Sequence, residues 1–257
     1  MDRDAAIERH RGALMSFIRL VGGGTETSQV LEPGGVTASV VPAIPDRSIV
    51  NSVAYRDAKA LEAALDDLAA AYEEAGIGAW TVWVPEDDRD VAALLEAAGH
   101  RLDATPTAMV ADLTLIPDPD PGDLDWGVDA STRDVGRIND LAYGWPENTF
   151  IRAMDRFADI DALHLYQARV DGEPVCVLGT YDNGDDCELY FVATLPDHRG
   201  QGLARRLVHQ ALIDARDRGL TVSSLQATKA GYPMWPGPYG TRIGRPSAWC
   251  SCFSWWR

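Results

Sequence analysis

The chain reads Glu188-Leu-Tyr-Phe-Val-Ala-Thr-Leu-Pro-Asp-His-Arg199-Gly200-Gln201-Gly202-Leu203-Ala204 over residues 188–204, and this stretch decides how the rest is interpreted. Its first half is β-branched, aromatic or aliphatic and stops at Pro196, which predicts a buried strand. From Leu203 onward apolar residues recur at helical spacing and Gly219 follows, which predicts a helix. The predicted order is therefore strand, glycine turn and helix.

That order predicts an anion site. Gly200 and Gly202 allow the backbone to approach a ligand closely, and the first-turn amides of a helix have no partner inside the helix. Together with the helix dipole they favour a phosphate group, and Arg199 and Arg205 add positive charge. The Walker pattern is absent because no Lys-Ser or Lys-Thr follows the glycines, and no Gly-x-Gly-x-x-Gly fingerprint occurs.

Residues 192–204 closely resemble the acetyl-coenzyme A loop of the GNAT N-acetyltransferase superfamily, whose signature is Arg/Gln-x-x-Gly-x-Gly/Ala. The resemblance implies an α/β GNAT fold, a mixed and mostly antiparallel sheet flanked by helices, with acetyl-CoA as cosubstrate and no metal. It implies that the strand before the loop separates from a strand at 220–227 and pairs with the pantetheine arm through Val192, Ala193 and Thr194. The pyrophosphate would then bind at Arg199, Gly200, Gln201, Gly202, Leu203, Ala204 and Arg205.

Acetyl transfer to an amine needs a proton acceptor for the amine and a donor for the leaving thiolate. Several family members place a catalytic carboxylate where Glu188 stands, so Glu188 is the candidate base; the alternatives are a solvated acid and a ligand for a cationic substrate. The neighbouring Asp185 and Asp186 are expected at the surface. For the thiolate acid, usually a tyrosine in the family, the candidates are Tyr232 and Tyr239, although Trp235 stands in the usual register.

Three domain segments are predicted. Residues 1–116 show helices near 2–20, 57–75 and 88–98 and strands near 36–43, 48–55, 79–84 and 107–115. This order resembles the later part of a GNAT domain without the glycine loop, which suggests a degenerate copy; a plain α/β cap domain is the alternative. The Pro/Asp-rich segment 117–123 is expected to be an interdomain linker.

Residues 124–257 carry the predicted GNAT domain. A strand near 126–128, a helix over 132–143 and a second helix from Pro146 come first, and the latter would bear Phe150, Ile151, Met154 and Phe157. Strands at 163–170 and 175–181 form a predicted hairpin, and Asn183-Gly184 turns into the Glu188 strand. These elements stand in family order.

Composition narrows the class of partner. The 257 residues carry a net charge of −16, which argues against nucleic acid and anionic membrane. Only two of the 23 basic residues are lysines, Lys59 and Lys229, which suggests adaptation to high salt; the alternative is a merely acidic protein of a GC-rich genome. The N-terminus lacks a signal-peptide core, and the four cysteines form no disulfide framework or zinc pattern. A cytoplasmic protein with free thiols is expected.

The tail differs from the rest. No Asp or Glu follows Asp217, four of the eight tryptophans lie after Met234, and residues 244–257 show no clean strand period. A shifted reading frame near Met234 would make 235–257 a non-native ending; a divergent tail that packs on the cleft or on a partner is the alternative.

The sequence thus favours an acetyl-CoA-dependent N-acetyltransferase that acts on a primary amine of a small molecule or a protein. One alternative is a non-catalytic acyl-CoA-binding regulatory module, and another is an interaction protein that binds no coenzyme A. Acids in the cleft would favour a cationic acceptor.

Overall fold

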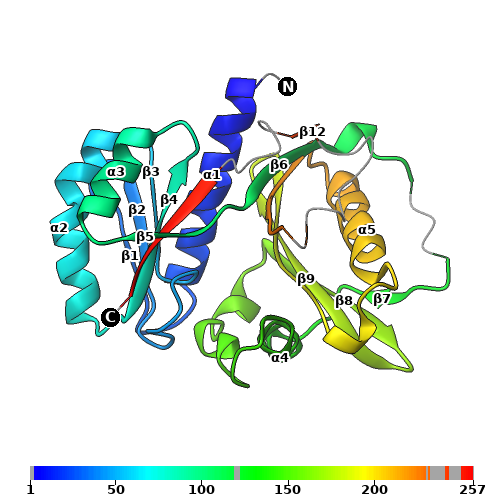
Figure 1. The fold of residues 1–257 in the computed structure, drawn as a ribbon. Coiled ribbons are helices and arrows are strands. Elements are labelled where there is room, and N and C mark those ends of the chain that lie inside the picture. The colour runs from blue at the N-terminus through cyan, green and yellow to red at the C-terminus, as the bar shows by residue number, and fades with distance from the viewer. Residues whose placement is uncertain (1–2, 119–121, 230, 232–240, 243–249, 257) are drawn as a thin grey trace. The chain divides into compact units, whose positions relative to one another are not determined.

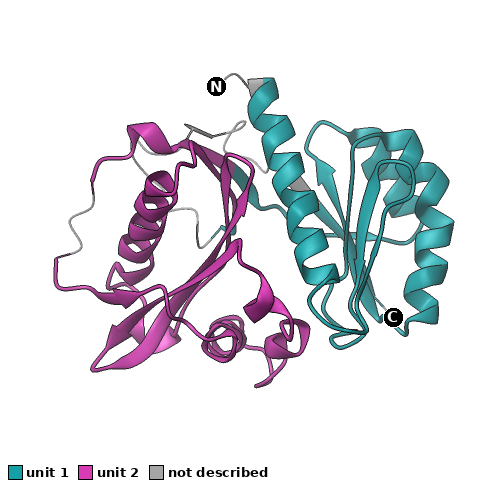
Figure 2. Ribbon diagram, turned by 180° about the vertical axis from the view of Figure 1, so that it is seen from behind, with its two compact units in different colours: residues 1–108, 227–229, 242–257 teal, residues 109–226, 230–241 magenta. Residues whose placement is uncertain are grey.

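The computed structural model describes residues 3–118, 122–229, 231, 241–242 and 250–256. The chain divides into two compact units (Figure 2). Unit 1 consists of residues 1–108, 227–229 and 242–257, and unit 2 consists of residues 109–226 and 230–241. Within the described ranges, no helix has the length and apolar character needed to cross a membrane.

Unit 1 contains a six-stranded sheet. Its strand order is β1 (Gln29–Leu31), β2 (Val36–Val40), β3 (Ser52–Tyr55), β4 (Ala79–Pro85), β13 (Cys250–Trp256) and β5 (Arg101–Ala104). Neighbouring strands are antiparallel except β3 and β4, which run parallel. This one parallel pair is connected by a helix, as parallel strands require.

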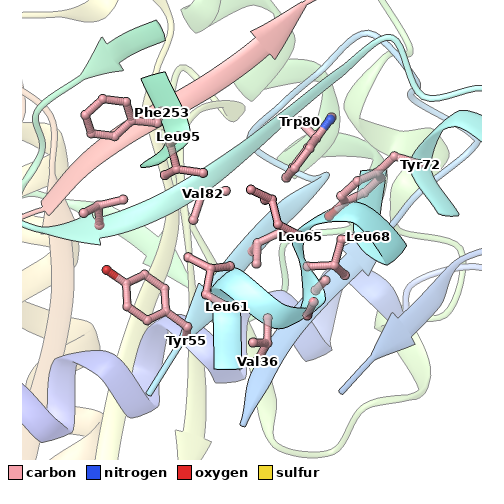
Figure 3. Packing of buried hydrophobic residues seen from close by; sticks show 14 of the residues in the cluster. Val36, Tyr55, Leu61, Leu65, Leu68, Tyr72, Trp80, Val82, Leu95 and Phe253 are labelled. Atoms are coloured by element: carbon pink, nitrogen blue, oxygen red, sulfur yellow. The ribbon is translucent and has the colours of Figure 1, made fainter. Parts of the chain in front are cut away.

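Helices cover both faces of the unit 1 sheet (Figure 1): α2 (Ala58–Glu74) and α3 (Arg89–Ala97) on one face and α1 (Arg3–Gly22) on the other. The apolar stripe of α2, which includes Leu68, packs on the strands in the main core, where Figure 3 shows Leu61 and Leu65 close to Val82. A second cluster joins α1 to the opposite face and contains Leu14, Met15, Ile18, Ala54, Trp83 and Cys252. Unit 1 therefore has a packed layer on each side of its sheet.

Unit 2 contains a seven-stranded sheet. Its strand order is β12 (Thr241–Arg242), β6 (Thr107–Asp112), β11 (Val222–Ala227), β10 (Asp186–Thr194), β9 (Glu173–Asn183), β8 (Leu163–Val170) and β7 (Asp125–Gly127). β10 and β11 run parallel, whereas β7 to β10 form antiparallel neighbours. Figure 1 shows α4 (Thr132–Tyr143) and α5 (Leu203–Asp217) on opposite sides of β8 and β9.

Two strands belong to a different sheet from the strand that precedes them in the sequence or from most of their half of the chain. β6 follows β5 of unit 1 in sequence, yet it lies between β12 and β11 in the unit 2 sheet. β13 comes last in the described chain and lies between β4 and β5 of unit 1. The units therefore divide near residue 108, and the C-terminal strand β13 belongs to unit 1, which differs from the expected boundaries at 1–116, 117–123 and 124–257.

The Pro/Asp segment 117–123 also differs from expectation, because its described residues belong to unit 2 and lie along α5. Arg206 donates to Asp123 at 2.9 Å and Arg216 donates to Asp118 at 2.7 Å. The arginines of one helix thus hold the acids of this segment. It connects β6 to β7 inside one unit instead of linking two.

The helix expected after Pro146 does not form. Two short 3-10 turns replace it, η2 (Phe150–Ala153) and η3 (Phe157–Asp159). The buried carboxylate of Asp140 accepts from the amides of Thr149 and Phe150 at 2.9 Å and 3.0 Å, and Asn148 has a φ of +60°. A turn fixed by Asp140 satisfies these amides, so the segment packs its aromatic rings without a continuous helix.

The expectation that the tail has no strand is wrong for Cys250–Trp256. β13 pairs with β4 over its whole length, from Cys250 opposite Pro85 to Trp256 opposite Ala79, and with β5 on its other side. Phe253 is 4% exposed and joins the main core of unit 1 (Figure 3). A segment read from a shifted frame would have no reason to fit a core in this way, so the pairing favours a genuine tail.

Candidate functional site

Strand β10 presents different side chains on its two faces. Cys187 lies on the α5 face with Asp182 of β9, which receives a bidentate contact from Arg218 at the end of α5 at 2.7 Å and 2.8 Å. Glu188 and Tyr190 lie on the opposite face, which α4 covers. The candidate base therefore belongs to the α4 side of the sheet.

β10 and β11 separate along their length. Their parallel pairing covers Asp186 to Glu188 opposite Val222 to Ser224 and extends no further among the described residues, although β10 continues to Thr194. On its other side β10 still pairs with β9, with Ala193 opposite Val177 and Thr194 opposite Cys176. Among the described residues, the segment from Leu189 to Thr194 is thus paired with β9 and not with β11, as the resemblance implied.

A bulge interrupts β10 at the point of separation. The register with β9 shifts between Tyr190 and Ala193, and Phe191 has a φ of +57°, a conformation that costs a non-glycine residue on the order of 1 to 3 kcal/mol. Asn139 of α4 secures the bulge by donating to the carbonyl of Phe191 at 3.2 Å. A Cβ at Gly179 would lie 3.0 Å from the ring of Phe191, so glycine leaves room for that ring.

The predicted loop leads to an N-terminus of α5 that no side chain caps, which we call the open helix entry. After β10, η4 (Pro196–His198) leads to Gly200 and Gly202, whose φ angles are +77° and +74°. Gly202 is the N-cap of α5 and has no side chain to bond the first-turn amides of residues 203–205. A Cβ built at Gly200 or Gly202 meets nothing within 4 Å, so the space beside this backbone is open.

The two predicted arginines differ in their surroundings. Arg199 donates from Nε to the carbonyl of Thr194 at 3.2 Å and from Nη2 to the carbonyl of Ala142 at 2.6 Å. Its guanidinium therefore ties the loop to the end of β10 and to α4. Arg205 is exposed on the first turn of α5, next to the uncapped amides. Of the two, Arg205 is the better placed to add charge to a bound phosphate group.

The side chain of Glu188 is buried and hydrogen-bonded to neighbouring side chains. Its side chain is 0% exposed, which differs from a solvated acid at a strand end. Asn183 donates to Glu188 Oε1 at 2.9 Å, and the hydroxyl of Tyr190 donates to Glu188 Oε2. The sequence analysis missed Tyr190, although its position two residues after Glu188 on the same strand face could have indicated it.

Two further predictions concern neighbouring positions. Asp185 is exposed, but Asp186 is only 5% exposed and accepts from the hydroxyl of Ser224 at 3.0 Å, so the surface expectation is wrong for Asp186. It belongs to β10, where it pairs with Val222 of β11, and not to the turn. The candidate acids Tyr232 and Tyr239 lie outside the described residues.

The cysteines on the strands of this site, Cys176 and Cys187, are buried. Burial raises the pKa of the Cys176 thiol to about 11, and burial also raises the pKa of the Cys187 thiol well above its ordinary value. A thiol in that state is a poor nucleophile near neutral pH. Within the described part of the chain, no group of three or more His, Cys, Asp or Glu side chains is placed to hold a metal ion.

Comparison with known proteins agrees with this geometry. Residues 135–235 match the model of the acetyltransferase (GNAT) family. The chain is similar to a GCN5-related N-acetyltransferase from Kribbella flavida at 16% identity and a TM-score of 0.63, over 96% of this chain and 93% of that one. It is also similar to a tandem GNAT protein from the clavulanic acid biosynthesis pathway at 12% identity and a TM-score of 0.53, over 97% and 95%.

A third similar structure is a GCN5-related N-acetyltransferase from Sphaerobacter thermophilus, at 17% identity and a TM-score of 0.56, over 86% of this chain and 80% of that one. No curated protein matched the chain. At these identities the similarities concern the fold, and they support a two-unit arrangement along nearly the whole chain.

Proposed function

Because residues 135–235 belong to the GNAT acetyltransferase family, we propose that the protein is an acetyl-CoA-dependent N-acetyltransferase acting on a primary amine of a small molecule or a protein. The observation that carries the proposal is the open helix entry at Gly200 and Gly202. It combines uncapped amides, positive-φ glycines and empty space beside the backbone. Backbone amides at a helix N-terminus suit a pyrophosphate.

The described residues fit the binding of acetyl-CoA, which would supply the acetyl thioester. The amides of residues 200–204 and the charge of Arg205 would bind the pyrophosphate. The backbone of Val192 to Thr194 would bind the pantetheine arm, because this segment of β10 is no longer paired with β11. Arg199 would act as a positioning residue that holds the loop through its two carbonyl contacts.

Glu188 would serve as the proton acceptor for the amine. Acceptance of a proton by a positioned carboxylate typically contributes a factor of about 10² to 10⁴ in rate. The position of Glu188 beside the bulge of β10 favours this role. The carboxylate that accepts the proton and the backbone that would bind the cosubstrate then belong to the same strand.

A non-catalytic acyl-CoA-binding module is the second candidate. One observation favours it: both oxygens of Glu188 already accept hydrogen bonds and the side chain is buried, as in a purely structural carboxylate. The two candidates agree on coenzyme A and differ in turnover.

The experiment is calorimetry with coenzyme A followed by measurement of thiol release from acetyl-CoA with a panel of amines. We expect binding, and thiol release that depends on one class of amine. Binding without transfer to any amine would favour the regulatory module. Absence of coenzyme A binding would overturn both candidates and favour an interaction protein.

A further inference from the structure

We propose that Tyr190 is the proton relay between the acceptor amine and Glu188. This inference rests on the proposed acetyltransferase function and assigns a residue to its first proton transfer. It uses the hydrogen bond from Tyr190 to Glu188 and the different exposure of the two side chains.

Glu188 does not reach solvent by itself. Its side chain is 0% exposed, and Asn183 occupies Oε1 while Tyr190 occupies Oε2. Tyr190 is partly exposed. Asn183 is exposed as well, but a side-chain amide does not relay a proton, so Tyr190 is the one of these two donors through which a proton can pass to Glu188. A hydrogen bond from a hydroxyl to a carboxylate is charge-assisted and strong, so the pair acts as one unit.

The backbone places Tyr190 where the strands separate. Pairing of β10 with β11 ends at Glu188, and the bulge begins at Tyr190. Gly179, the β9 partner of Tyr190, has no side chain on this face, and the ring of Phe191 fills that space. The contact between Tyr190 and Phe191, with ring centroids 5.9 Å apart, fixes the phenol on the α4 side beside Glu188.

The ammonium form of the acceptor gives a proton to Tyr190 Oη while the Tyr190 hydroxyl proton passes to Glu188 Oε2. The products are a free amine, a neutral tyrosine and a protonated glutamic acid. After acetyl transfer, the second proton of the nitrogen goes to the departing thiolate. Glu188 then returns its proton to solvent through Tyr190.

Other titratable groups come from the strands around this pair and from α4, which covers the same face. Asp186 comes from β10 itself, and Tyr181 comes from β9 opposite Glu188. Asp140 comes from α4, and its oxygens accept from the amides of Thr149 and Phe150. The β11 residues paired with this segment, Val222 to Ser224, carry no ionisable side chain. The test therefore compares variants that remove one contact of Glu188 at a time.

The kinetic test uses Tyr190→Phe and the matched control Asn183→Ala, which removes the other donor to Glu188. We expect Tyr190→Phe to lower kcat about 100-fold with little change in the KM for acetyl-CoA. Its remaining activity should rise with pH in step with the free-base fraction of the amine. Asn183→Ala should lose about tenfold or less and keep the shape of the wild-type pH profile.

A second measurement does not depend on turnover. Proton NMR of the ligand-free wild type should show a downfield, slowly exchanging hydroxyl resonance that disappears in Tyr190→Phe, moves upfield in Glu188→Gln and persists in Asn183→Ala. Absence of this resonance from the wild type would overturn the relay.

Equal losses in Tyr190→Phe and Asn183→Ala, with an unchanged pH profile, would reduce Tyr190 to a positioning residue and also overturn the relay. If the wild type transfers acetyl to no amine, the proposed function fails and the relay falls with it. An active wild type with a fully active Tyr190→Phe refutes the relay alone.

Discussion

The two units use the same strand-to-helix connection in different ways. In unit 1, β3 ends at Tyr55 and α2 begins at Ala58, with Asp57 as an N-cap whose carboxylate accepts from the amide of Ala60 at 2.9 Å. In unit 2, residues 195–202 separate β10 from α5, and the N-cap is Gly202. An aspartate thus satisfies one helix end from within, whereas glycine leaves the other free for an external anion.

The preceding strands differ as well. β3 is buried along its whole length and pairs with β2 without a register shift. β10 becomes partly exposed at Tyr190, carries the bulge and separates from β11. Unit 1 therefore keeps the topology of unit 2, with an antiparallel and then a parallel neighbour, but lacks the features that would bind a cosubstrate. Shared topology without these features is what a degenerate first copy would have.

The largest expected effect is on the stability of unit 1. Phe253→Ala should destabilise unit 1 by about 4 kcal/mol, because it removes a buried aromatic side chain from the main core. Chemical denaturation measures the loss. Trp256→Ala on the same strand is the control, since Trp256 is 52% exposed and should change stability little. Equal effects of the two variants would refute the core position of β13.

The next effect concerns unit 2. Gly202→Asp should weaken coenzyme A binding by about 3 kcal/mol, roughly 100-fold, because a carboxylate would stand where the pyrophosphate is expected. The control is Gly76→Asp, which carries the same charge and a similar φ, +71° against +74°, in equally open space of unit 1. Calorimetry of both variants should show a loss only for Gly202→Asp, and unchanged affinity there would remove the cosubstrate assignment.

A third prediction concerns the dependence of the stability of unit 1 on pH. His100 is 4% exposed and packs edge-to-face on Trp80, and burial lowers its pKa from 6.5 to about 4. The unfolded chain therefore takes up the proton first, and the stabilisation that is present above pH 6.5 is lost as the pH falls toward 4. Between pH 7 and pH 5 this amounts to about 2 kcal/mol.

Denaturation of unit 1 at pH 7 and pH 5 measures this loss. His100→Phe keeps an aromatic contact to Trp80 and should remove about half of the acid sensitivity, because burial also lowers the pKa of His10 to about 4. His100→Leu repeats the test with a smaller side chain. A loss between pH 7 and pH 5 as large as that of the wild type in both variants would contradict the prediction.

The smallest effect tests the cap itself. Asp57→Ala should destabilise unit 1 by about 1 kcal/mol, because the amide of Ala60 loses its partner. It should confer no coenzyme A binding, since the connection of two residues still lacks the glycines. Asp66→Ala, an exposed acid in the middle of α2, controls for the lost charge. Coenzyme A binding to the Asp57→Ala variant through unit 1 would show that the cap alone separates the two copies.

Local pattern predicted the region around the candidate site well. The helix over 132–143, the hairpin and the strand, loop and helix from Glu188 to Asp217 all form as expected, because each has a clear period and matching turn residues. The path of the tail was not predictable in this way. Cys252, Phe253 and Ser254 are all buried because β13 is covered on both faces, which erases the alternation that marks a half-exposed strand.

The local sequence pattern also could not predict which single acidic residues are buried. Asp186 follows Asn183-Gly184 closely and reads as part of a polar turn, but the parallel neighbour β11 covers it and Ser224 supplies a donor. Whether such an acid is buried depends on pairing between strands that are distant in sequence, and this pairing cannot be deduced from the neighbouring residues.

The position of β13 has a consequence for the order of events during synthesis. β4 and β5 leave the ribosome long before β13, and they cannot complete their sheet until all of α5 and β11 has been made. Nascent chains generally fold from the N-terminal domain onward. Until β13 is made, β4 and β5 lack the strand that lies between them in the complete sheet, and unpaired strand edges invite pairing with other chains. Completion of the unit 1 sheet therefore depends on the synthesis of β13, which follows all of unit 2's described helices and strands in the chain.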